Sequence, residues 1–192
     1  MTARWVVDEV EPHRDLNVVW QPISLMFKND VQPDAENYPA VFKTHRMLRV
    51  MEAVRAELGE AAVQRWYLLA GTTVHHDGER DTADLAAMLD HLGFDPELAE
   101  AADDQAWDTE IRRRMDIGLE LAGNDIGTPI IAMDNADGDR QAYFGPVITR
   151  VPPGDLSLKL WDALTAMMDV PGFWELKRTR TEGPEFGDRP DI

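Results

Sequence analysis

Cysteine is absent from the 192 residues of this chain. A disulfide framework, a cysteine-based zinc site and a thiolate nucleophile are therefore excluded for these residues. No stretch approaches the roughly eighteen consecutive apolar residues that span a bilayer. The N-terminal MTARWVVDEV also lacks the basic region and long apolar core of a signal peptide. We expect a soluble, cytoplasmic protein.

Basic residues are scarce, with 19 Lys and Arg against 36 Asp and Glu, which gives a net charge of −17. Such a surface repels phosphate backbones and anionic lipid headgroups, so we expect neither nucleic-acid nor membrane partners. The length fits one domain, or one domain with an insertion, and the hydrophobic fraction of 44% is that of an ordinary globular protein. No glycine-rich phosphate loop is present.

Helical and strand patterns alternate in an unusual order. Apolar residues at helical spacing begin almost at Met1, and LNVVWQPISL predicts a strand over residues 16–25, at a sheet edge or with a bulge at Pro22. Residues 40–122 are helical almost throughout. Within them Asp81 and Asp95 are expected helix N-caps, and Gly93 is expected to end a helix.

A β-hairpin follows the helical block, with strands over 129–133 and 141–144 around the turn DNADGDR. A final helix is predicted over 155–168, and the polar tail is expected to lie on the surface or to be loose. A lone strand and a hairpin make a poor sheet, so the pattern indicates an α/β protein that lacks one strand.

The stretches ARWVVDEV, WQPISL, NDIGTPII, FGPVITRVPPG, KLWDA and FWELKRTRTE carry a resemblance that covers most of residues 3–182. Together they resemble the DsbA-type branch of the thioredoxin superfamily, and in particular the mycothiol-dependent nitroreductases of actinobacteria. The resemblance implies a thioredoxin-like (DsbA-type) α/β fold with an all-helical insertion and with the first strand missing from this chain. The implied division is a discontinuous thioredoxin-like portion over 1–39 and 123–175, the insertion over 40–122 and a C-terminal tail over 176–192.

The same resemblance implies where a site would lie. The Thr128–Pro129 bond would be cis, and Gly127, Thr128 and Pro129 would form one wall facing a redox motif. Thr128 would offer backbone hydrogen bonds to a mixed disulfide. Asn29 and Tyr38 match positions that line the pocket beside that motif; taken alone, they also fit a turn and a packing role. None of the residues present would be the catalytic nucleophile.

The implied function is a DsbA-like thiol-disulfide oxidoreductase, possibly a mycothiol-dependent reductase of small molecules. It would have no covalently bound cofactor and would be redox-inactive as given, because the cysteine motif is absent. We expect the natural protein to carry a strand and motif upstream of Met1; the alternative is a gene that truly lacks them. A thiol-free binding or assembly module, or an enzyme like the kappa-class glutathione transferases, remains open. Expected partners are a small-molecule or thiol substrate and, if sheet edges are bare, a second copy in a homodimer.

Other candidate sites are weaker. His75 and His76 invite a metal interpretation, but adjacent side chains on a helix diverge by about 100°, so we expect a solvated helix end and no metal. Ser24 and Ser157 are expected to lack a nearby base, and neither lies in an elbow motif, so a serine hydrolase is not supported.

The segment LKRTRTE gathers cations in an otherwise acidic chain: Lys177, Arg178 and Arg180, with Arg189 further on. We expect these side chains to form salt bridges to the acidic body. Anion binding or subunit docking is the alternative.

Overall fold

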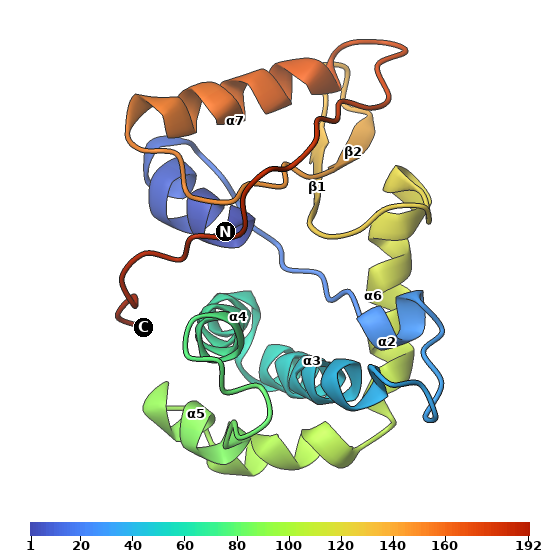
Figure 1. The fold of residues 1–192 in the computed structure, drawn as a ribbon, viewed down its shortest axis with the longest axis vertical. Coiled ribbons are helices and arrows are strands. Elements are labelled where there is room, and N and C mark those ends of the chain that lie inside the picture. Colours follow the sequence, from blue (N-terminus) through green and yellow to red (C-terminus); the bar gives the residue numbers. More distant parts are fainter. The chain divides into compact units, whose positions relative to one another are not determined.

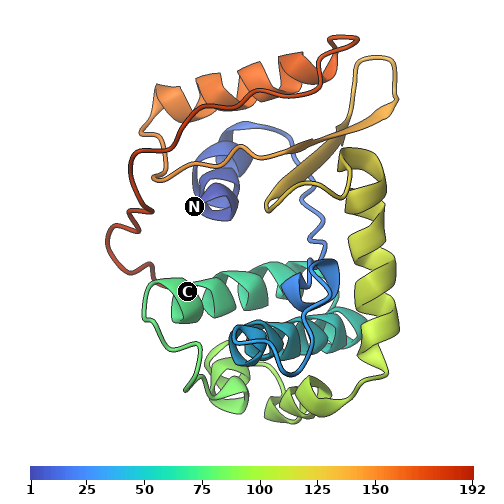
Figure 2. The ribbon, with the colours of Figure 1, turned by 45° about the vertical axis from the view of Figure 1, so that its right-hand side comes forward.

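The computed structural model describes residues 1–192 and is mostly helical, with one small sheet (Figures 1 and 2). Its elements are α1 (Thr2–Arg4), η1 (Trp5–Val10), η2 (Glu11–His13), α2 (Leu25–Lys28), α3 (Tyr38–Leu58), α4 (Glu60–His75), α5 (Leu85–His91), η3 (Pro96–Asp103), α6 (Trp107–Ala122), β1 (Ile130–Asp134), β2 (Arg140–Phe144) and α7 (Asp155–Met168). No helix is both long enough and apolar enough to cross a membrane.

Two compact units share the chain. The hairpin unit comprises residues 1–18 and 117–187, and the helical unit comprises residues 19–116 and 188–192. The structure thus supports a mixed α/β protein. The thioredoxin-like portion, insertion and tail expected at other boundaries stay a prediction.

The hairpin unit is built around an antiparallel pair of strands, β1 and β2, in which Ile130 faces Phe144 and Asp134 faces Arg140. The turn between them is closed by the Asn135 side chain, which accepts hydrogen bonds from the backbone N–H groups of Asp137 and Asp139. Gly138 has a φ of +86°, which favours glycine. The predicted hairpin is therefore confirmed, as is the final helix, which is α7.

One face of this hairpin packs into an apolar core shared with η1 and α7. Trp5 is fully buried there, its ring 5.9 Å from that of Trp161, and its indole N–H donates to the Ser157 carbonyl at 3.3 Å. Ile131, Met133 and Tyr143 supply the strand side of the core. The helical spacing of the first ten residues thus serves to cover the sheet.

The helical unit has its core between α3, α4, α5 and η3 (Figure 2). Trp66 is 1% exposed and its indole donates to the Met47 carbonyl. Gly59 joins α3 directly to α4 with a φ of +83°, a conformation that few other residues adopt at low cost. The helices expected over 40–122 are present. Asp95 caps η3 as predicted, whereas α5 is capped by Asp84 and not by Asp81.

The strand predicted over residues 16–25 is wrong. Residues 15–24 are extended but belong to no sheet, and the segment ends in the short helix α2, which Ser24 caps. The Trp20 ring stacks on Tyr67 at 4.5 Å, and the Trp20 carbonyl accepts a hydrogen bond from Arg55 at 2.6 Å. Side chains of α3 and α4 therefore provide the contacts that a neighbouring strand would have provided.

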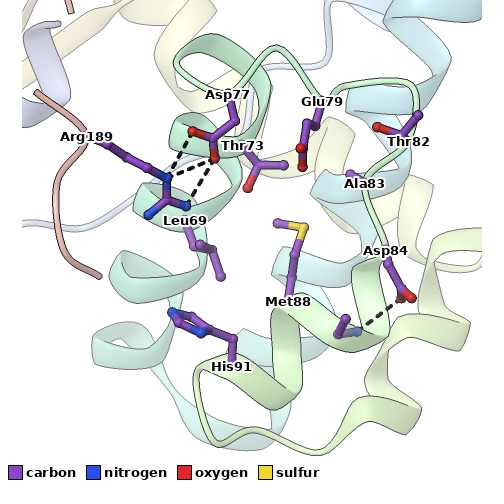
Figure 3. Close-up of a pocket in the computed structure, with 11 residues that line it drawn as sticks. Leu69, Thr73, Asp77, Glu79, Thr82, Ala83, Asp84, Met88, His91 and Arg189 are labelled. Carbon is purple, nitrogen blue, oxygen red and sulfur yellow. Dashed lines mark hydrogen bonds and ion pairs between the residues drawn. The ribbon is translucent and has the colours of Figure 1, made fainter. Parts of the chain in front are cut away.

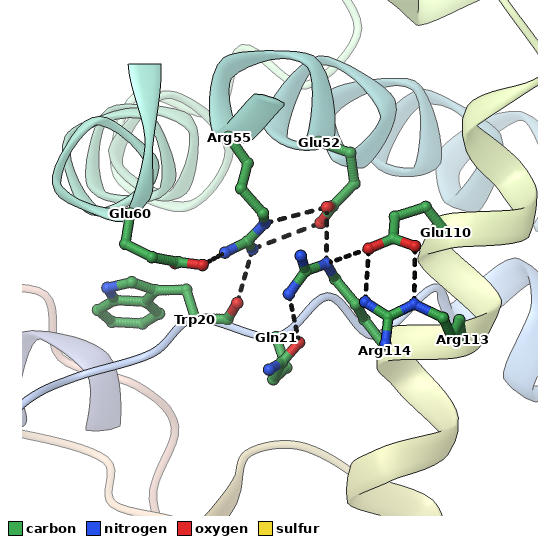
Figure 4. A network of polar contacts seen from close by, with 8 residues as sticks. All are labelled: Trp20, Gln21, Glu52, Arg55, Glu60, Glu110, Arg113 and Arg114. Atoms are coloured by element: carbon green, nitrogen blue, oxygen red, sulfur yellow. Dashed lines mark hydrogen bonds and ion pairs between the residues drawn. The ribbon is translucent and has the colours of Figure 1, made fainter. Parts of the chain in front are cut away.

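A buried ion network fixes this extended segment against three helices (Figure 4). Glu52 of α3 is 1% exposed, and its carboxylate pairs at 3.0 Å with both Arg55 and Arg114. Arg55 also pairs with Glu60 of α4, and Arg114 pairs with Glu110 at 2.8 Å. A hydrogen bond from Arg113, together with the charges of both arginines, lowers the pKa of Glu110 to about 2, so this carboxylate stays charged.

The final residues return to the helical unit, so the tail lies on the surface, as one of the two expectations had it, and its end is not loose. Arg189 makes a bidentate pair with Asp77, and the Ile192 backbone oxygen lies 2.9 Å from His91 Nε2. The Ile192 side chain packs against the core of the helical unit. Residues 188–192 are therefore anchored, although the tail before them is exposed.

The Glu52 network gives a test of stability. Glu52→Gln removes the buried negative charge and leaves two guanidinium groups without their shared partner, so we expect a loss of about 3 kcal/mol in the free energy of unfolding. Urea denaturation followed by circular dichroism measures it. The control is Glu57→Gln on the exposed side of α3, which should change stability by less than about 0.5 kcal/mol. Equal effects of the two substitutions would contradict the role of Glu52.

Candidate functional site

The first part of the candidate site is the loop that enters the hairpin. α6 ends at Ala122, and residues 123–129 lead into β1. Gly127 and Thr128 are exposed, Pro129 is half-buried, and the Pro129 carbonyl accepts a hydrogen bond from Gly145 N–H at 2.8 Å. The Thr128–Pro129 and Gly145–Pro146 bonds are both cis.

The loop is packed tightly against the sheet. A Cβ atom on Gly127 would lie 3.3 Å from the Phe144 ring, so any side chain here requires that ring to shift by a few tenths of an ångström. On the neighbouring strand exit, the Thr2 hydroxyl donates to the Pro146 carbonyl at 2.7 Å and joins the first helical turn to the sheet. These contacts hold the loop in place, while the backbone of residues 127–128 stays exposed.

The second part of the candidate site lies in the helical unit, around the end of α2 and the start of α3. Asn29 follows α2, is exposed, and is succeeded by Asp30 with a φ of +47°. Tyr38 is the first residue of α3, and its ring stacks on Phe42 with centroids 5.4 Å apart. No hydrogen bond or ring contact joins Asn29 to Tyr38.

A buried polar relay holds this corner together. Ser24 Oγ lies 3.0 Å from His45 Nδ1, and His45 Nε2 lies 3.0 Å from Asp108 Oδ1. Arg49 donates to both oxygens of Asp108, at 2.6 and 2.8 Å. Ser24 and His45 are fully buried. The relay therefore joins α2, α3 and α6.

Proton positions in the relay follow from what each group can do. The Asp108 carboxylate only accepts, so His45 Nε2 carries the proton that it receives. Burial lowers the pKa of His45, against the opposing effect of Asp108, so the ring is neutral and its Nδ1 accepts from the Ser24 hydroxyl. Burial raises the pKa of Asp108, but hydrogen bonds from Arg49 and His45 outweigh it and leave that pKa below its ordinary value.

This relay corrects the expectation that Ser24 has no base near it. The order Ser–His–Asp is that of a nucleophilic triad, yet the Ser24 hydroxyl is fully buried and also accepts the Phe27 N–H that caps α2. A substrate cannot reach it. The relay is therefore a structural support for the corner that carries Asn29 and Tyr38.

Sequence reasoning missed His45, Arg49 and Asp108. A usable signal was present, because His45, Arg49 and Glu52 follow one another at spacings of four and three along α3. Such spacing places charged residues along one side of a helix, and in α3 that stripe is buried. Buried charged side chains need partners, so this stripe was the signal from which a polar network within the helical unit could have been inferred.

The residues predicted as a site thus fall into two groups. Gly127, Thr128 and Pro129 belong to the hairpin unit, while Asn29 and Tyr38 belong to the helical unit. His76 pairs with Asp77 at 3.2 Å, and no group of three or more candidate ligands is placed to hold a metal ion.

The fold and these surfaces define a mixed α/β protein, mostly helical, whose described residues contain no cysteine. A family model described as "Mycothiol-dependent nitroreductase Rv2466c" matches residues 1–178, and the chain belongs to this Rv2466c-like family. A Mycobacterium tuberculosis (strain ATCC 25618 / H37Rv) protein named Rv2286c, itself described as uncharacterized, is 26% identical over 183 residues, which is 94% of this chain and 76% of that protein.

The relay predicts a pH dependence of stability. His45 has a lowered pKa when folded, so between its unfolded value near 6.5 and the lower folded value the unfolded chain binds more protons. Its contribution is therefore fully present above the unfolded pKa and is lost as the pH falls below it. We expect the urea midpoint to fall between about pH 7 and pH 5. The His45→Gln variant, although less stable overall, should show a flatter profile over that range. Parallel profiles for the two proteins would contradict the assignment.

Proposed function

We propose that this protein acts in a mycothiol-dependent reduction of small molecules on a DsbA-like, thioredoxin-type framework. The match of the family model over residues 1–178 carries the proposal. The exposed backbone at Gly127 and Thr128, backed by the Phe144 ring, supports it as a wall against which a thiol or mixed disulfide can bind. Asn29 and Tyr38 are proposed to hold the ligand by hydrogen bonds.

The low-molecular-weight thiol would be the reductant in this reaction, because these residues include no cysteine that could be oxidised. Two thiols joining in one disulfide release two electrons and two protons. A nitro group that accepts them becomes a nitroso group and loses one oxygen as water. In this scheme the protein binds and orients both reactants, which can supply a large rate enhancement without a protein nucleophile.

The absence of cysteine also favours a second candidate, a thiol-free binding module that keeps the pocket and performs no turnover. The two candidates share the binding step and differ in the redox step. A dithiol exchange of the DsbA type cannot occur on these residues, so in either case we expect the protein not to accelerate the reduction of insulin above the rate with dithiothreitol alone.

Binding is the first prediction of the proposed function. Mycothiol should bind saturably in isothermal titration calorimetry, and Thr128→Arg should weaken it by at least about tenfold, because a long side chain at this wall obstructs the ligand. Thr109→Arg, at an exposed position of α6, is the matched control and should leave the affinity unchanged. An equal affinity for the two variants would contradict the assignment of the wall.

Turnover then separates the two candidates. Consumption of a nitroaromatic compound by mycothiol, followed by absorbance with and without the protein, should be accelerated saturably if the reductase proposal holds. Thr128→Arg should reduce that acceleration along with the affinity. Saturable binding without any acceleration would overturn the reductase proposal in favour of the binding module.

A further inference from the structure

The tail of the hairpin unit displays an amphipathic segment, residues 174–180, which we name the basic segment. Its two apolar side chains are far more exposed than is usual: Trp174 is 85% exposed and Leu176 is 80% exposed. Residues 173–180 adopt neither helix nor strand. Two large apolar side chains that are this exposed, only two residues apart, make this segment a candidate interaction surface.

The basic segment is held at both ends by contacts with the hairpin unit, so the fold itself keeps the segment exposed. Before it, the Phe173 ring packs against Tyr143 at 5.7 Å, and the Tyr143 hydroxyl donates to the Phe173 carbonyl at 3.0 Å. After it, Glu182 pairs with Arg150, and the Glu185 N–H donates to the Thr149 carbonyl.

The cations of the basic segment are only weakly balanced within their own chain. Hydrogen bonds from Thr149 and Arg150 lower the pKa of Glu182, and the charge of Arg178 adds a smaller effect. Lys177, Arg178 and Arg180 are exposed and form no salt bridge, although the chain carries a net charge of −17. The expectation that they fold back onto the acidic body is wrong for these three residues, and holds only for Arg189, which pairs with Asp77. Exposed cations without a salt bridge favour a local acidic patch on a protein surface as their partner, because complementary charges steer two such surfaces together.

The helical unit of the same chain offers such a surface (Figure 3). A cavity of about 290 Å³ has an apolar floor that includes Leu69 and Met88, and its rim carries Asp77, Glu79 and Asp84. Arg189 already rests on Asp77 at this rim, so a guanidinium group fits there. Glu79 is exposed and forms no salt bridge, which leaves one carboxylate available for a further cation.

We propose that the basic segment of one copy of this chain binds the acid-rimmed cavity of a second copy. The Trp174 and Leu176 side chains cover the apolar floor, and the cations after them pair with Glu79 and its neighbours on the rim. Each copy carries both surfaces, so the contact links copies of this chain to one another. Aromatic and arginine side chains are the residues that most often dominate such interfaces.

The test is the dimer dissociation constant of the full chain, measured by analytical ultracentrifugation over a range of concentrations. Trp174→Ala and Arg178→Glu should each raise the constant by at least about tenfold. Raising the salt concentration from about 0.05 to 0.5 M should also weaken the dimer, because the cations are solvent-exposed. The control is Lys159→Glu, an exposed cation on α7, which should leave the constant within about twofold.

A charge reversal identifies the acceptor surface. Glu79→Arg should weaken the dimer by itself, and the combination of Glu79→Arg with Arg178→Glu should recover most of the loss. Both altered side chains are exposed, so folding is checked by circular dichroism and should be unchanged. A chain that stays monomeric at all concentrations, a dimer that the tail variants do not affect, or a double variant without recovery would overturn the proposal.

Discussion

The helical unit depends on one buried carboxylate, that of Glu52. An isolated charge in such a place costs several kcal/mol, and here the cost is offset because the guanidinium groups of Arg55 and Arg114 meet it from two directions. The same Arg55 holds the Trp20 carbonyl, so the chain that leads to Ser24 is fixed as a consequence. The ion network thus holds the extended segment in place, and the Ser24 relay holds α2, the helix that follows this segment.

The features that could be predicted from the sequence are those whose contacts are local in the chain. Helix ends were predictable where a cap is local, as at Asp95, and the hairpin was predictable because Asn135 and Gly138 lie within one short turn. The error over residues 16–25 has a different origin. An apolar, β-branched run fits a strand equally well whether its partners are a sheet or, as here, side chains that lie tens of residues away, such as Tyr67.

In the candidate site too, residues that are neighbours in the sequence could be predicted, and contacts between residues far apart in the chain could not. The loop at Thr128 was visible because its glycine, threonine and proline are consecutive, and the structure gives it a packed base on Phe144. The stripe of His45, Arg49 and Glu52 signals that α3 buries polar groups, but the sequence does not show their partners. His45 contacts Ser24 and Asp108, which lie on two other elements far away in the chain. In the proposed function, the binding surfaces belong to this chain and the redox-active sulfur belongs to its small-molecule partner, so a protein without cysteine can still serve in thiol chemistry.

The Ser24 hydroxyl performs two tasks with one oxygen, accepting from the Phe27 N–H and donating to His45. Few replacements satisfy both. Alanine loses the cap and the relay together, and asparagine or aspartate can cap a helix but has a longer side chain for the same buried space. Threonine alone keeps the hydroxyl, at the cost of fitting one more methyl group. We therefore expect this position to tolerate less sequence drift over evolutionary time than the exposed loop beside it, although it touches no substrate.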